Sequence, residues 1–319
     1  MTTAVARLTT TLSPFCAFLA SNKRGVQRRS PSTTSLITGA ATIVLLLLSL
    51  NPPAHSQGVC TGLCQQQVSC GPGPGGVLVT TAVSGYVHAP NGTDPLPNVL
   101  VYIPNSPVLP MPNGVQCGPP PVSGTPLALT YTYPNGSFYL ENVPVGSNIP
   151  LVIQLGKWRR QFVIPTVSAC INNAGGAFAM PANQSQGDIP RIAIQTGATS
   201  APECVVRKVG ISDSEFTGPN GGGRVNFFPI DGATTSTNTG GDPGLWSSVN
   251  QYDQTTLACL GYADYPDEGE GAGYVNAGGR LVAEHSIYPV FQYSPYFALS
   301  GRVFKTFQRS LATNLISPQ

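Results

Sequence analysis

The chain has 319 residues and a formal net charge of +2, and only 9% of its residues are charged, roughly a third of the usual fraction. Glycine and proline are abundant, with 36 and 31 residues, while 41% of the residues are hydrophobic. This composition excludes a charged disordered protein, a coiled coil and a collagen. It also disfavours an all-helical fold, because proline and glycine interrupt helices and favour short strands joined by tight turns.

The first 56 residues have the pattern of a secretory signal peptide. Five basic residues precede an uncharged apolar run at 36–50, and two prolines and a small-residue site at 54–56 follow it. The run is shorter than the roughly 20 residues that a membrane span needs. We therefore expect cleavage near Ser56 and a secreted, periplasmic or cell-surface protein; a retained membrane anchor is the alternative.

Removal of this leader reverses the charge balance. The leader holds five of the 16 basic residues and none of the 14 acidic ones, so the mature chain keeps 11 basic residues and a net charge of −3. A basic surface for nucleic acid is therefore not supported. We expect no nucleic-acid partner, and contact with a membrane only through an uncleaved leader.

Seven cysteines follow the leader, and in an exported protein they are disulfide candidates. They are Cys60, Cys64, Cys70, Cys117, Cys170, Cys204 and Cys259. An odd number leaves at least one thiol free or paired between chains. The first three lack the CxxC spacing or nearby histidine that would complete a tetrahedral zinc site, so we expect no metal and no cofactor.

A Cys-rich and Gly/Pro-rich linker at 57–76 leads into short strands separated by prolines. Strands are predicted at 77–87, 98–103, 127–133, 137–140, 151–155 and 158–164. The turn sequences at 134–136 and 156–157 each predict a hairpin. Residues 77–175 therefore predict a small antiparallel β-sandwich, with a proline-rich insertion at about 104–126 that carries Cys117.

Four segments of this stretch resemble, in order and spacing, the carboxypeptidase regulatory-like domain, a transthyretin-like sandwich. They are SGYV at 84–87, PLPNVLV at 95–101, YPNGSF at 133–138 and NVPVG at 142–146. Gly136 supplies the positive φ that its turn needs. Phe138 and Leu140 fall on one face of their strand by alternation.

From residue 188 the pattern alternates between strands and helices. Strands are predicted at 189–195, 223–228, 255–260 and 280–285, with helices at about 200–209, at 245–252 and before Gly278. Ser200 is the expected N-cap of the first helix, and Gly210 is its expected C-terminal stop. This alternation predicts a parallel sheet.

This second half resembles the class I glutamine amidotransferase-like and ThuA-like α/β domains, which are flavodoxin-like. The resemblance rests on YD at 252–253 before TLAC at 256–259, and on YVNAGGRLVAEH at 274–285. It implies an α/β domain over 188–319, in which 290–303 either supplies a fifth strand or the domain is truncated. Together the halves resemble exported bacterial proteins that join two such domains.

Cys259, His285 and Glu284 are the candidate catalytic residues, because they fall at the carboxyl ends of two predicted strands, where α/β sites gather. A nucleophilic cysteine needs an oriented base. Leu257 stands where the G-x-C-x-G elbow of true amidotransferases has glycine. Glu284 and His285 are adjacent on one predicted strand, so their side chains point to opposite faces. We expect no catalysis and instead a Cys204–Cys259 disulfide at one sheet edge; a hydrolase acting on carbohydrate or peptide is the alternative.

Two loops have some features of a ligand site, but ordinary structural roles explain them better. The loop at 196–203 precedes a helix but lacks the glycine pattern and lysine of a nucleotide site. The acidic loop with Asp264, Asp267, Glu268 and Glu270 lacks EF-hand spacing, so a solvated loop is expected rather than a calcium site.

A basic hairpin end carries Lys157, Trp158, Arg159 and Arg160, and it is either an ordinary charged turn or a docking patch for an anionic surface. Taken together, these patterns predict an exported cell-envelope or secreted protein with a binding or structural role. Its expected partner is a cell-envelope component, a carbohydrate or a protein.

Overall fold

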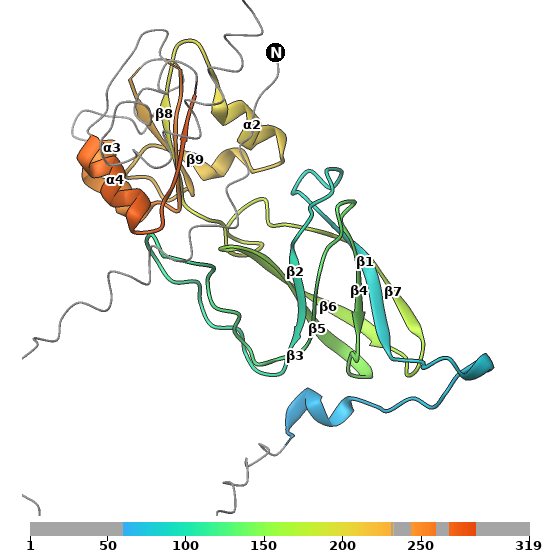
Figure 1. Ribbon diagram of the computed structural model, residues 1–319. Helices are drawn as coiled ribbons and strands as arrows, with labels where there is room; N and C mark the ends of the chain where they lie inside the picture. The colour runs from blue at the N-terminus through green and yellow to red at the C-terminus, as the bar shows by residue number, and fades with distance from the viewer. Residues whose placement is uncertain (1–59, 231, 233–243, 260–267, 285–319) are drawn as a thin grey trace, which may run out of the picture.

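A computed structural model describes residues 60–230, 232, 244–259 and 268–284, which form three β-sheets with short helices (Figure 1). The leader with its expected cleavage site lies outside these residues. No helix in the described ranges is long and apolar enough to cross a membrane. The chain is a β-rich fold, and below, residues 77–179 are called the two-sheet part and residues 188–284 the parallel-sheet part.

Two disulfides hold the segment that precedes the sheets. Cys60 bonds to Cys64 across a single 3₁₀ turn, with an S–S distance of 2.01 Å. Cys70 bonds to Cys170, 100 residues further along, with an S–S distance of 2.07 Å. The second bond fastens this segment to the connection that follows the last strand of the antiparallel sheet.

The two-sheet part consists of a four-stranded antiparallel sheet and a three-stranded mixed sheet. Across the first sheet the strands are β3 (Pro126–Tyr131), β2 (Leu100–Pro104), β5 (Gly146–Leu155) and β6 (Trp158–Val167). Across the second they are β4 (Ser137–Glu141), β1 (Ala82–His88) and β7 (Asn172–Ala179). Strand β1 pairs antiparallel with β4 and parallel with β7.

One apolar core, with side chains from both sheets, lies between the two sheets. Strand alternation supplies it: Val83 and Val87 of β1 are fully buried, whereas Tyr86 between them points outward. Phe138 and Leu140 of β4 share the inner face, as predicted. The two sheets are therefore stacked around one core, held by side chains whose burial stabilises by about 1.5–3 kcal/mol each.

The predicted turn at Gly136 is present, but it does not close a hairpin. Gly136 has a φ of +76°, and its N–H donates to the Tyr133 carbonyl. Strand β3 before the turn pairs with β2, and strand β4 after it pairs with β1, so the chain crosses here from one sheet to the other. The predicted hairpin is wrong because each strand finds its hydrogen-bond partner in a central strand of its own sheet.

The second predicted hairpin is confirmed. Leu155 at the end of β5 pairs with Trp158 at the start of β6, and the two residues between them form the turn. Gly156 takes a φ of +60°, which is the conformation that a two-residue hairpin turn requires.

The parallel-sheet part holds five strands that all run in one direction, as the alternating pattern predicts. In order across the sheet they are β12 (Arg280–Ala283), β11 (Gln254–Leu257), β8 (Ile192–Thr196), β10 (Val225–Pro229) and β9 (Phe216–Thr217). The α-helices are α2 (Pro202–Lys208), α3 (Leu245–Ser248) and α4 (Glu268–Asn276). The 3₁₀ helices of the described chain are η1 (Gly62–Gln66), η2 (Pro74–Gly76), η3 (Asp213–Glu215) and η4 (Val249–Gln251).

Helices cover both faces of this sheet. On one face, Ala193 of β8 packs in a cluster with Leu245 of α3 and Tyr274 of α4. On the other face, Ile194 of β8 packs in a cluster that Val206 of α2 joins. Because consecutive residues of β8 are both fully buried on opposite sides, its apolar sequence follows from burial on two faces.

Helix α2 begins one residue later than predicted. Its N-cap is Ala201, without a side-chain hydrogen bond, because the Ser200 hydroxyl is used elsewhere. Gly210 after the helix has a φ of +103°, and Gly278 after α4 has a φ of +102°, so both predicted glycine stops are confirmed.

Candidate functional site

The basic hairpin end at 157–160 lies within the protein and not in solvent as a docking patch. Trp158 and Arg160 are half-buried, the Lys157 side chain is 10% exposed, and Arg159 is 4% exposed. The Trp158 indole N–H donates to the Pro181 carbonyl at 2.9 Å, and the Arg160 guanidinium donates to a main-chain carbonyl of β7 at 3.1 Å. The docking-patch interpretation is therefore wrong, because the polar groups of these residues have partners inside the chain.

An ion pair joins this hairpin to the parallel sheet. Lys157 Nζ lies 2.7 Å from Asp253 Oδ1, and the two side chains are 10% and 9% exposed. Asp253 stands directly before β11, and its Oδ2 accepts the backbone N–H of Arg191, which precedes β8, at 2.9 Å. Lys157 Nζ also donates to the Gly114 carbonyl. One carboxylate therefore ties the hairpin to the starts of two neighbouring strands.

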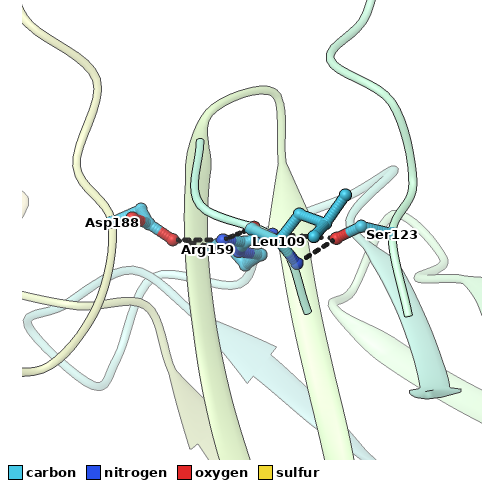
Figure 2. Close-up of polar contacts among 4 residues, drawn as sticks. All are labelled: Leu109, Ser123, Arg159 and Asp188. Carbon is cyan, nitrogen blue, oxygen red and sulfur yellow. Dashed lines mark hydrogen bonds and ion pairs between the residues drawn. The ribbon is translucent and has the colours of Figure 1, made fainter. Parts of the chain in front are cut away.

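Arg159, which is itself buried, is the centre of a second polar cluster (Figure 2). Its Nε donates to Asp188 Oδ2 at 2.9 Å, one terminal nitrogen donates to the Leu109 carbonyl at 2.8 Å, and the other donates to Ser123 Oγ at 3.3 Å. The main chains of Arg159 and Asp188 also exchange two hydrogen bonds, of 3.0 and 2.8 Å. The planar guanidinium thus fixes three segments at once.

A buried tyrosine lies beside the same guanidinium. Tyr102 of β2 is fully buried, on the outer face of the four-stranded sheet. Burial raises the pKa of Tyr102, and the positive charge of Arg159 opposes that rise. Val108 of the insertion packs against the cluster of Leu100, Tyr102 and Val152, so the insertion covers this part of the outer face.

The insertion between β2 and β3 covers the amino-terminal edge of the parallel sheet. The Val115 N–H donates to the Asn250 carbonyl at 3.0 Å. A Cβ atom on Gly278 would lie 2.1 Å from the Gln116 carbonyl oxygen, so only glycine fits there. Cys117 of this insertion is disulfide-bonded, in keeping with its place among the disulfide candidates. Figure 1 shows the insertion reaching from the sheets toward α4.

A small cavity of about 40 Å³ remains between the insertion and the strand starts. Its charged lining residues come from both parts of the chain: Lys157, Asp188, Arg191, Arg224 and Asp253. A space of this size has room for water-sized molecules. At the amino-terminal edge the two parts therefore contact each other, and the basic and acidic residues that line the cavity nearly balance in number.

At the opposite edge of the sheet, a loop closes over Cys259. Cys259 is 4% exposed, its N–H donates to Ser200 Oγ at 2.7 Å, and its carbonyl accepts the Thr199 hydroxyl at 2.7 Å. A Cβ atom on Gly197 would lie 2.4 Å from the same carbonyl oxygen. The loop at 196–203 therefore serves the backbone of Cys259 rather than a bound anion.

The expected Cys204–Cys259 disulfide is not formed. Cys204 is an exposed thiol in the first turn of α2, whereas Cys259 is buried beneath the loop that precedes this helix. The prediction is wrong because α2 packs through Val206 and Val209, which turns Cys204 toward solvent.

Of the other candidate catalytic residues, the described part of the chain includes Glu284 alone. Its N–H donates to the Leu257 carbonyl at 3.0 Å, and its side chain is half-buried. His285 lies outside the described residues, as do Asp264 and Asp267 of the acidic loop. In the described ranges, no three His, Cys, Asp or Glu side chains gather as metal ligands.

Sequence reasoning missed the acidic partners of the hairpin. Neither Asp188 nor Asp253 was predicted as a site residue, although Asp188 stands directly before a predicted strand and Asp253 stands two residues before another. In a chain with so few charges, single acids at strand starts opposite a basic hairpin are the signal that would have found them.

No known protein family and no curated protein matches the chain. Among solved structures, it is similar at 18% identity to two interface mutants of a type II cohesin–X-dockerin complex from Acetivibrio cellulolyticus. Each match covers 41% of this chain and 85% or 88% of the other, with a TM-score of 0.24. It is also similar, at 13% identity, to the dioxygenase domain of a dioxygenase carbohydrate-binding protein fusion from Streptomyces sp. SirexAA-E. That match covers 52% of this chain and 83% of the other, with a TM-score of 0.16. Scores this low carry no argument about this chain.

Proposed function

We propose that this chain is an exported cell-envelope or secreted protein that binds a partner or supports structure and does not catalyse a reaction. The enclosure of Cys259 carries the proposal. A nucleophilic cysteine must be accessible to its substrate. Cys259 is 4% exposed under the Gly197–Ser200 loop, whose hydroxyls are already bonded to its backbone.

We further propose that the two-sheet part is a carboxypeptidase regulatory-like domain over 77–175 and that residues 188–319 form a flavodoxin-like domain. The stacked sheets and the Gly136 turn support the first assignment. For the second, the four longer parallel strands stand in the order β10-β8-β11-β12, which is 2-1-3-4 in chain order, as in flavodoxin-like sheets. Strand β7 ends at Ala179, so the first boundary extends beyond 175.

Export is supported by the disulfides. Cys60–Cys64 and Cys70–Cys170 are bonds that form and persist in oxidising compartments. The partner that we propose is a cell-envelope carbohydrate or protein. The hydrolase alternative depends on His285, outside the described residues, so we do not propose it.

Thiol alkylation of the folded protein tests the non-catalytic role. With iodoacetamide and peptide mass spectrometry, we expect Cys204 to be modified quickly and Cys259 only after unfolding, because one is exposed and the other buried. Cys204→Ser is the matched control. Rapid modification of native Cys259, together with loss of a hydrolytic activity in Cys259→Ala, would overturn the proposal.

Cell fractionation with N-terminal sequencing tests export separately. We expect a mature protein that begins near Gln57 and is found outside the cytoplasm. A protein that keeps residues 1–56 and stays in the cytoplasm would contradict export and leave the alkylation result unaffected.

A further inference from the structure

We propose that the outer face of the three-stranded sheet β4-β1-β7 binds a neutral saccharide. This inference deepens the proposed binding role and rests on it. The face presents two large aromatic side chains to solvent: Tyr86 of β1 is 49% exposed and Tyr139 of β4 is 42% exposed. Buried neighbours on both strands face the core, so the two tyrosines are on the outer side by alternation.

The strand register places the two rings close to one another. Tyr86 pairs with Ser137, and Tyr139 pairs with Ser84, so the tyrosines are diagonal neighbours on adjacent strands. Diagonal positions of this kind lie about 7–8 Å apart, within reach of aromatic side chains. The His88 ring stacks on Tyr86, with ring centroids 6.4 Å apart and planes 22° apart. The Tyr86 and His88 rings are thus stacked, Tyr139 stands diagonally across on the next strand, and these three residues are called the aromatic platform below.

Small side chains beside the platform leave it accessible. On β7, Ala177 pairs with Tyr86 and Ala174 pairs with Ser84. Figure 1 shows the β4-β1-β7 sheet with its outer side turned away from the four-stranded sheet and from the parallel-sheet part. A flat ligand therefore reaches the ring faces without displacing a larger side chain.

The charge of the face indicates which ligand it suits. Strands β1, β4 and β7 contain no lysine or arginine, and Glu141 at the end of β4 is their one acidic residue. Polar groups on the face are hydroxyls and amides, among them Ser84 Oγ, which accepts from Asn172 Nδ2 at 3.0 Å. A neutral sugar stacks its C–H face on aromatic rings and bonds its hydroxyls to such groups, whereas an anionic polymer finds no lysine or arginine on these three strands.

A matched control comes from the other sheet. Tyr131 of β3 is 57% exposed on the outer face of the four-stranded sheet. It pairs with Leu100 and has no second exposed aromatic side chain on its neighbour β2. A substitution of Tyr131 removes a ring that is somewhat more exposed than Tyr86 or Tyr139 without touching the platform.

Affinity electrophoresis of the mature chain tests the inference, with soluble starch, hydroxyethylcellulose, xylan, mannan or polygalacturonate in the gel. We expect retardation by at least one of the four neutral polymers and not by polygalacturonate. Tyr86→Ala/Tyr139→Ala is expected to weaken that binding roughly tenfold, since two ring contacts are lost. Tyr131→Ala is expected to bind like the wild type, and thermal unfolding verifies that all three proteins are folded.

Three outcomes would overturn the inference. They are binding to none of the neutral polymers, binding that survives the double substitution, and equal weakening by Tyr131→Ala. The second leaves the proposed binding role intact and removes only this face as its site. Failure of the proposed function has a different readout, because it requires thiol-dependent turnover at Cys259.

Discussion

Lys157 and Asp253 form an ion pair of 2.7 Å between the turn of one β-hairpin and the start of a parallel strand. Both side chains are about nine-tenths removed from water, so their attraction is weakly screened and each depends on the other for a counter-charge. The Asp253 carboxylate also accepts a hydrogen bond from the Arg191 N–H. The pair therefore links the two-sheet part to the start of β11 in the parallel sheet.

Removal of one charge from this pair is expected to destabilise the protein. Asp253→Asn leaves the Lys157 ammonium enclosed without a counter-ion, which costs about 2–4 kcal/mol in the free energy of unfolding. Urea unfolding followed by circular dichroism measures the loss. Lys157→Met/Asp253→Asn is expected to lose less than the two single substitutions added together, because neither charge is then left unpaired. Additive losses would contradict a direct coupling.

Arg159→Lys tests whether the cluster around buried Arg159 depends on guanidinium geometry. A lysine ammonium cannot reach Asp188, the Leu109 carbonyl and Ser123 together, so we expect a loss of roughly 2–3 kcal/mol although the charge is kept. Arg207→Lys is the control, because Arg207 pairs with Asp213 at the surface and both side chains are about two-thirds exposed. Its expected cost is below about 0.5 kcal/mol. Equal effects in the two variants would refute the prediction.

Local patterns predicted the parallel-sheet part well. Apolar runs bounded by glycine and proline gave strands β8, β10, β11 and β12, and the glycines after α2 and α4 take the expected positive φ. These features depend on neighbours within a few residues of chain. A pattern of that range suffices where each strand is buried on both faces.

Long-range pairing is what the sequence did not reveal. Strand β7 is rich in asparagine, glycine and alanine and has no β-branched residue, so nothing local predicts it; it forms because β1 offers a parallel partner. The Gly136 turn was found, but its strands belong to different sheets. At the candidate site, burial of Arg159 required knowing that the insertion and Asp188 fold over it.

The two resolved disulfides are expected to contribute unequally to stability. Cys70–Cys170 closes a loop with a sequence separation of 100, whereas Cys60–Cys64 has a separation of 4. By chain entropy, the first bond is worth about 4–5 kcal/mol and the second about 2 kcal/mol. Cys70→Ala/Cys170→Ala is therefore expected to lower the free energy of unfolding by about twice as much as Cys60→Ala/Cys64→Ala. A larger loss in the second variant would contradict this ranking.

Stability is expected to fall at alkaline pH through Tyr274, which is fully buried in the parallel-sheet part. Burial raises its pKa from 10.0 to about 12. Between these values the folded protein holds the phenol proton more tightly than the unfolded chain, so the stabilisation is complete below pH 10 and is lost as the pH rises toward 12. This residue alone is expected to remove roughly 2 kcal/mol between pH 9 and 11.5.

Urea unfolding at a series of pH values in this range measures the effect, and Tyr274→Phe is the matched variant. Without the hydroxyl, the alkaline loss of stability is expected to shrink by about the same 2 kcal/mol. The remaining slope includes Tyr102 and Tyr252, because burial raises the pKa of both in the folded protein. Parallel pH profiles for Tyr274→Phe and the wild type would contradict the prediction. They would mean that the pKa of Tyr274 is the same in the folded and unfolded protein.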